Sequence, residues 1–349
     1  MQANSNRVYY LDLLRILACF AVIVVHVSEL NFGDQCNSQW AISNIYDSMT
    51  RWCVPVFVMI SGALFLDPKR NFSLKSIIRK NIFRLITAFA FWSIIYAIYC
   101  HLCFKPMNAS GLIAEILIGP GHLWFLYMII GIYITIPIMR KIASDKQLTK
   151  YFLLLSLIFT FCIPFFIRIL DLIPSLKPIS ALANNLFTFF DFNIGAGFLG
   201  YFLLGHYLNC TSFSKKTENL ILALGIISYL TIAGVTYLIC ATTSVDDKFL
   251  YSNFSPLVIF EAMAMFVWIK RLKLHEYKLS NKFAHIAKLS FGIYLAHMLV
   301  FYILESIGLT ANIVSPILGI PLMSIATFIT CYGLAFILSK IPYLNKYII

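Results

Sequence analysis

Charged residues are scarce in this chain, and no long polar segment interrupts its apolar runs. Only 12% of the 349 residues are Asp, Glu, Lys or Arg, while 60% are apolar and the mean hydropathy is +0.83. Soluble domains carry about 25% charged residues. No polar stretch exceeds about thirty residues, which argues against a separate soluble domain. We therefore expect one membrane domain over residues 1–349.

The apolar runs also lack the alternating pattern of membrane β-strands. Runs of about 20 apolar residues can cross about 30 Å of hydrocarbon as helices. The first run is too long for a cleaved leader and contains charged residues, so it counts as a span. We expect an all-α, polytopic bundle of about ten membrane-spanning helices. These are expected over residues 8–29, 45–66, 82–104, 121–140, 150–170, 194–209, 217–241, 254–270, 285–305 and 313–339.

Acidic residues are few beside basic ones, since 15 Asp and Glu against 27 Lys and Arg give a net charge of +12. Such an excess can indicate a nucleic-acid partner, but here it follows the loops. Of the 27 basic residues, 21 fall in alternate loops, at or near residues 7, 69–84, 140–150, 215–216, 270–288 and 340–346. The opposite loops hold Arg51, Lys105, Arg168, Lys177 and Lys248. This positive-inside bias predicts cytoplasmic termini and no nucleic-acid partner.

Cysteine pairs with ligand spacing are almost absent, although the chain has nine Cys. The CxxC pair of Cys100 and Cys103 has no second pair, so no metal site is expected. A disulfide between Cys36 and Cys53 is an open alternative on the outer side. The letters GxGxxG occur at residues 195–200 inside a predicted span, which favours close helix packing over dinucleotide binding.

Two ionisable residues in the first span, Arg15 and His26, are the strongest candidates for function. A charge within a bilayer costs at least about 2.5 kcal/mol and indicates a functional site by default. Eleven helical steps of about 100° bring both side chains to one face, about 16 Å apart along the axis. Arg15 is expected in the inner third of the membrane and His26 near its outer end. The plainer alternatives are a snorkelling Arg15 neutralised by Asp12 and a His26 that merely lies near the interface.

Histidines on two later spans are expected at a depth similar to that of His26. His122 starts the fourth span beside Trp124, and imidazole suits a general base or an oxyanion partner. His297 shares one face of the ninth span with Ser290 and Tyr294, at i, i+4 and i+7. Interfacial aromatic residues and interhelical hydrogen bonds would explain the same positions without catalysis.

Three further polar residues fall at or inside predicted spans. Glu261 lies midway along the eighth span and is a candidate partner for Arg15 or for a histidine. Arg51 is expected to open the second span near the outer surface, and Ser61 lies toward its inner end.

A basic inner segment leads into the third span, where Arg84 lies one turn inside the helix. It also contains Lys75, Arg79 and Lys80. These residues could bind phosphates through charge-assisted hydrogen bonds, but the topology signal and lipid headgroups explain them equally well.

The order of these segments resembles the acyltransferase 3 family of integral membrane acyltransferases. The family's hallmark, a basic residue followed after ten residues by a histidine in the first span, matches Arg15 and His26. Around residues 44–55 the chain is most similar to the enterobacterial common antigen O-acetyltransferase type. Four later segments match in order: residues 54–62 (VPVFVMISG), the basic segment ending at Arg84, residues 122–126 (HLWFL) and residues 290–297 (SFGIYLAH).

The resemblance implies acyl transfer from acyl-CoA, usually acetyl-CoA, to a hydroxyl of a cell-surface glycan or its lipid-linked precursor. It also implies a multi-pass protein of the bacterial inner membrane. The added SGNH esterase-like domain of some members is not expected here. Direct transfer is preferred to an acyl-enzyme, because no Ser or Cys is obviously paired with a base.

On this interpretation each candidate residue has a role. His26, as general base, His122 and Arg15 form the catalytic group. The acyl donor is expected against Arg15, Arg79, Lys80, Arg84 and Ser61. The acceptor or the oxyanion is expected against Arg51, Trp124, Tyr294, His297 and Glu261.

A proton-coupled transporter or exporter is the competing class. Intramembrane Arg, His and Glu residues on facing helices also suit a carrier. The absence of inverted repeats in the sequence argues mildly against it. Consumption of acetyl-CoA by the purified protein separates the two classes.

Overall fold

The computed structural model describes residues 7–32, 36–70, 73–104, 106–189, 196–273 and 280–349. In this part of the chain every regular element is helical, so the all-α expectation is confirmed. The α-helices are α1 (Tyr9–Ser28), α2 (Ser38–Ser48), α3 (Cys53–Phe65), α4 (Leu74–Ser76), α5 (Phe83–Cys103), α6 (Ala109–Ile118), α7 (Trp124–Ser144), α8 (Lys146–Leu155), α9 (Ile163–Asp171), α10 (Lys177–Phe189), α11 (Ala196–Cys210), α12 (Lys215–Thr243), α13 (Pro256–Arg271), α14 (Ser280–Ser306), α15 (Pro316–Ser339) and α16 (Pro342–Tyr347). Short 3-10 helices are η1 (Glu29–Asn31), η3 (Gly121–Leu123), η5 (Pro174–Leu176) and η6 (Phe249–Tyr251), and π-helical stretches are η2 (Ile77–Ile82) and η4 (Ser156–Cys162).

The described residues form eight helical segments that are long and apolar enough to cross a membrane. They are Tyr9–Asn31, Ser38–Phe65, Leu74–Cys103, Gly121–Ser144, Lys146–Asp171, Lys215–Thr243, Phe283–Ser306 and Pro316–Ser339. The other two expected spans correspond to α11 and α13, which have 15 and 16 residues. At 1.5 Å per residue these two helices reach only about 24 Å.

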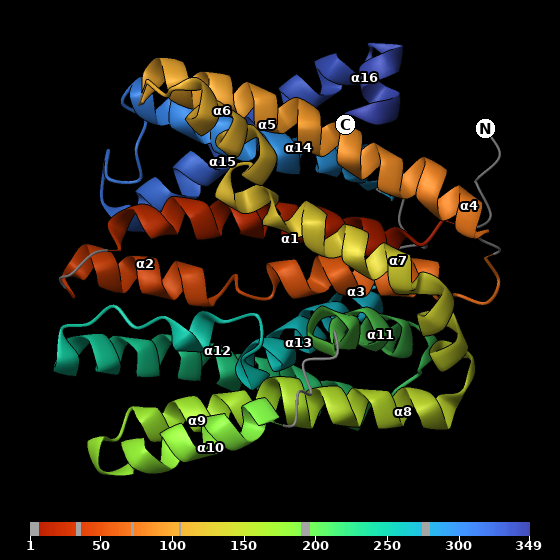
Figure 1. The fold of residues 1–349 in the computed structure, drawn as a ribbon, viewed down its shortest axis with the longest axis vertical. Helices are drawn as coiled ribbons and strands as arrows, with labels where there is room; N and C mark the ends of the chain where they lie inside the picture. Colours follow the sequence, from red (N-terminus) through yellow and green to blue (C-terminus); the bar gives the residue numbers. More distant parts are fainter. Residues whose placement is uncertain (1–6, 33–35, 71–72, 105, 190–195, 274–279) are drawn as a thin grey trace.

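The long helices run side by side along one direction, with α1 and α3 in the middle of the view and α8, α9 and α10 at its lower edge (Figure 1). Of the most apolar part of α1, 72% is buried inside the protein, against 11% for the Lys146–Asp171 segment. The apolar outer surface of the latter suits lipid contact. The basic segments around α4 and between α7 and α8 lie at the right of the view, which the positive-inside rule assigns to the cytoplasm. Lys105 lies outside the described residues.

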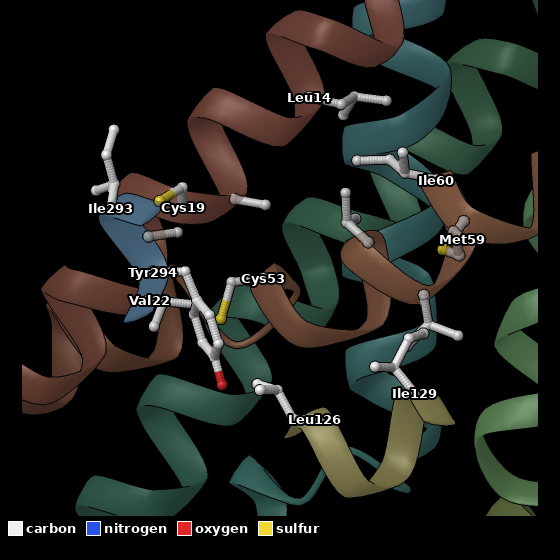
Figure 2. Close-up of a cluster of buried hydrophobic side chains, with 14 of the residues drawn as sticks. Leu14, Cys19, Val22, Cys53, Met59, Ile60, Leu126, Ile129, Ile293 and Tyr294 are labelled. Carbon is white, nitrogen blue, oxygen red and sulfur yellow. The ribbon is translucent and has the colours of Figure 1, made fainter. Parts of the chain in front are cut away.

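The core gathers around α1, because α3, α14 and α15 pack directly against it. Figure 2 shows side chains from α1, α3, α7 and α14 in one buried cluster, among them Leu14, Val22, Ile60, Leu126 and Ile293. This cluster holds α1 in place along the side that carries Arg15 and His26.

The second span is interrupted, which corrects the expected position of Arg51. Residues 49–52 form a turn between α2 and α3, so Arg51 lies inside the span instead of at its outer end. Pro55 occupies the first turn of α3, where its missing N–H needs no partner. Backbone hydrogen bonds from Met49, Thr50 and Cys53 continue across the break, so the chain turns there with its backbone largely satisfied.

Glycines set the closest approach between helices, at α3 and α11. A Cβ added to Gly62 would lie 1.7 Å from the carbonyl oxygen of Phe202, and one added to Gly205 would lie 2.0 Å from that of Met59. Farther along α11, a Cβ at Gly197 would meet the Phe254 ring at 2.5 Å. Gly195 lies outside the described residues. The helix-packing interpretation of these small residues therefore holds for the described part of α11.

Candidate functional site

A cavity of about 700 Å³ runs through the bundle from the basic end to the histidines. Its inner part is lined by Arg7, Asp12, Arg15, Arg70, Asn81, Arg84 and Lys288. Its far part is lined by His26, His122 and Trp124. Apolar side chains line the stretch between them, among them Val22, Ile60 and Ile129. Ligand sites of small molecules have similar volumes, typically about 300–1,000 Å³.

Arg15 and His26 both line this cavity, as their helical phase predicts. The Asp12 carboxylate forms an ion pair with Arg7 at 2.7 Å, and its charge also acts on Arg15. Tyr133 of α7 lies close to Arg15 and, with Ser61, lines the same wall. Arg15 thus lines the cavity. Arg7, and not Arg15, is the arginine that forms an ion pair with Asp12.

The basic residues expected to bind the donor divide into two groups. Arg84 lines the cavity, donates to the backbone oxygen of Ile349 and leaves its Nε without a partner among the described residues. Arg79 and Lys80 are exposed and do not line the cavity, whereas Asn81 of the same π-helical stretch η2 does. Arg7 and Lys288, which the sequence did not single out, line the inner mouth in their stead.

Three histidines from three distant segments meet at the outer part of the cavity, where His26 and His122 line the wall and His297 is buried behind them. The His297 ring lies 4.8 Å from the His122 ring and 5.3 Å from the His26 ring, centre to centre. The His297 Nδ1–H donates to the carbonyl oxygen of Tyr294. The Nε2 atoms of His122 and His297 are buried and have no partner within the described residues. These histidines were predicted to lie at a similar depth, and their rings are in direct contact.

Glu29 orients His26, and the sequence analysis did not identify it. The His26 Nδ1–H donates to the Glu29 carboxylate at 3.2 Å. This bond fixes the tautomer, because the proton on Nδ1 leaves Nε2 as the basic nitrogen. The sequence signal for this contact was the spacing, because a residue three positions after His26 lies on the same helix face.

Arg51 completes this group from the break in the second span. Its guanidinium forms an ion pair with Asp47, whose side chain is fully buried, and lies 3.8 Å from Glu29. It also stacks over the Tyr251 ring, 4.3 Å from the ring centre. Arg51 is therefore engaged by two carboxylates, and its main effect is to hold Glu29 and Asp47 in place.

Glu261 does not contact Arg15 or the histidines, which corrects the expected pairing. It lies on α13 with both carboxylate oxygens buried and without a hydrogen-bond partner among the described residues. The charges of Arg51 and Asp47 act on it. Glu261 is also absent from the walls of the cavity.

Tyr294 lines the cavity, but its hydroxyl is already used. It donates to the carbonyl oxygen of His122 and so ties α14 to the start of α7. Its ring lies in the buried cluster with Val22 and Cys53 (Figure 2). Nearby, Tyr96 donates to the carbonyl oxygen of Leu295. These tyrosines position the histidine-bearing segments.

A second cavity of about 440 Å³ lies against the outer loop between α12 and α13. It is lined by Arg51, Trp124, Phe198, Lys248, Tyr251, Ser252, Asn253 and Phe254. Trp124 and its neighbour Phe198, at 5.7 Å between ring centres, form an aromatic wall. Because Trp124 lines both cavities, it stands between the inner passage and this outer chamber.

The remaining polar motifs give no ligand cluster in the described part of the chain. No three His, Cys, Asp or Glu side chains converge there as metal ligands do. In the CxxC segment, His101 Nδ1 accepts a hydrogen bond from the Met107 backbone at 2.8 Å. Cys53 is buried at the start of α3, and the thiol near Cys36 is that of Cys240, which corrects the open pairing of Cys36 with Cys53.

Comparison with known proteins gives one match. A family model described as an acyltransferase domain matches residues 8–336, which include all three histidines and every residue that lines the two cavities except Arg7. No curated protein and no solved structure matches the chain.

Proposed function

The chain belongs to the acyltransferase 3 family of membrane acyltransferases, and we propose that it moves an acetyl group from acetyl-CoA to a hydroxyl of a cell-surface polysaccharide or its lipid-linked precursor. The observation that carries this proposal is the single cavity that joins the basic inner end to His26 and His122. We place the protein in the bacterial inner membrane, and the enterobacterial common antigen type is the nearest subgroup proposed.

The inner part of the cavity suits the donor. The CoA phosphates carry several negative charges, and Arg7, Arg84 and Lys288 would face them at the cytoplasmic mouth. The extended arm of the donor would pass Arg15 and the apolar wall and bring its thioester to His26. The apolar middle of the passage suits this arm, which carries no charge.

His26 would act as the general base. As the acceptor hydroxyl attacks the thioester carbonyl, its proton passes to His26 Nε2. The tetrahedral intermediate then collapses, the C–S bond breaks, and the imidazolium returns the proton to the CoA thiolate. General base catalysis of this kind contributes typically about 10²–10⁴-fold.

In this proposal, His122 stabilises the oxyanion of the tetrahedral intermediate. Tyr294 donates its hydroxyl proton to the His122 carbonyl oxygen, and Arg51 is paired with Asp47 and Glu29 and does not line the cavity that holds His26. The His122 Nε2 is unpartnered within the described residues and lies in the wall of the cavity. It must carry a proton when it fills this role.

The outer chamber suits the acceptor. Its aromatic residues Trp124, Phe198 and Tyr251 offer flat faces to the apolar side of a sugar ring, while Lys248 and Asn253 offer donors to its hydroxyls. Since Trp124 borders both cavities, an acceptor held there would present a hydroxyl near His26. Transfer would then finish on the outer side of the membrane.

The test is acetyl transfer by the purified protein in proteoliposomes, with release of free CoA as the readout. We expect His26→Ala and His26→Gln to lose at least about 10²-fold in turnover. His285→Gln is the matched control, because His285 lies on α14 beside Tyr332 and away from the cavity. Turnover retained in both His26 variants would refute the assignment of the base.

The same assay distinguishes the proposed acyltransferase from the competing class, a proton-coupled carrier. The two cavities adjoin at Trp124 and together extend through much of the bundle, which would also suit a carrier. A proton-coupled carrier would move its cargo without consuming acetyl-CoA. Absence of CoA release with intact, folded protein would therefore favour the carrier.

A further inference from the structure

Two cysteines that are far apart in the sequence meet at the outer end of the bundle. Cys36 directly precedes Asn37, which caps the N-terminus of α2, and Cys240 lies in the last turn of α12. The two helices pack against each other and run in opposite directions. Asn44 Nδ2 donates to the Ala233 carbonyl oxygen at 2.8 Å and fixes their register.

This register of α2 against α12 places Cys36 and Cys240 at the same level. Seven residues before Asn44 is Asn37, and seven residues after Ala233 is Cys240. Each step covers about 10.5 Å along its helix, and the steps run in the same direction because the helices are antiparallel. The start of α2 and Cys240 must therefore lie at one level. The side chains of Cys36 and Cys240 are accordingly close enough to interact.

The two thiols also differ in their exposure to solvent. Cys36 is partly exposed, whereas the Cys240 side chain is almost fully buried. Both are free thiols in the structure. An oxidant can reach Cys36 first, and Cys240 is then the neighbouring thiol that resolves the mixed disulfide.

We propose that Cys36 and Cys240 form a disulfide at the outer face of the bundle. Its placement in an oxidising compartment rests on the orientation given in the proposed function. The oxidant is a thiol–disulfide oxidoreductase of that compartment. The Cys36 thiolate attacks the oxidant's disulfide and releases one of its sulfurs as a thiol. The Cys240 thiolate then attacks the Cys36 sulfur and releases the second, so both electrons and both protons end on the oxidant's dithiol.

The disulfide would fasten the outer end of α2 to α12. The same helix carries Asn44, which accepts from the Tyr251 hydroxyl, and Asp47, which pairs with Arg51. The bond therefore stabilises the scaffold of the polar group behind His26 and takes no part in the chemistry. We expect reduction to lower the midpoint of thermal unfolding by several degrees, because the bond closes a loop of about 200 residues.

The test is disulfide mapping of the wild-type protein from bacterial membranes, alkylated during denaturation without reductant. We expect a cross-linked peptide of Cys36 and Cys240, lighter than the two thiol peptides by two hydrogen atoms. Cys36→Ser should free Cys240 for alkylation, while Cys53→Ser should leave the linked peptide unchanged. Recovery of both thiols fully alkylated from the wild type would overturn the proposal. This result does not depend on catalysis, so an inactive protein with the cross-link would count against the proposed function alone.

Discussion

Replacing Glu29 by Gln tests whether this carboxylate orients the catalytic imidazole. A hydrogen bond to a charged partner contributes about 1.5–3 kcal/mol when it is shielded from water. The Glu29 side chain is 42% exposed, so solvent screening reduces the effect to about 1 kcal/mol. Since 1.36 kcal/mol corresponds to about tenfold in rate, we expect kcat to fall about fivefold in Glu29→Gln.

The assay is the initial rate of acetyl transfer at varied donor and acceptor concentrations. The KM values should stay unchanged, because Glu29 lines neither cavity. Glu115→Gln on α6 is the matched control and should behave as wild type. An unchanged kcat in Glu29→Gln, or an effect confined to KM, would refute the idea that Glu29 acts through His26.

Three further outcomes follow from the geometry. Gly205→Ala should lose about 1–3 kcal/mol of stability by overpacking against Met59, whereas Gly131→Ala, with open space at its Cβ, should not; thermal unfolding in detergent measures both. Arg84→Gln should raise the KM for acetyl-CoA about tenfold with little change in kcat, because it removes a charged partner of the phosphates; an unchanged KM would count against the inner mouth as donor site. Phe198→Leu should raise the acceptor KM about two- to tenfold and leave the donor KM alone, since it removes an aromatic contact of the outer chamber; equal effects on both would contradict that assignment.

Features set by local helix geometry were predictable from the sequence. The phase of Arg15 and His26 follows from the constant rotation per residue, and both residues line one cavity. The similar depth of His122 and His297 follows from the span order and the positive-inside rule, and their rings lie 4.8 Å apart. Helix existence was also predictable, because long apolar runs have no other means of satisfying their backbone in lipid.

Features set by tertiary packing were not predictable. The partner of a buried charge depends on which helices adjoin, and so Glu261 lies near Arg51 and Asp47 instead of Arg15. The break at residues 49–52 was not predicted, because the polar helix α2 that precedes it is buried by packing against neighbouring helices and is not recognisable as part of an apolar span. Glu29 was different, since its spacing from His26 was visible and only its place at the edge of the expected span hid its role.

The central claim is that an acetyl group crosses the bundle from a donor on the basic side to a hydroxyl on the opposite side. It is tested most directly in proteoliposomes of one orientation, with radiolabelled acetyl-CoA on the Lys- and Arg-rich face and a glycan acceptor on the other. We predict that label appears on the acceptor across the membrane and that the signal is lost with His26→Gln. Transfer only when donor and acceptor share one face would contradict the account.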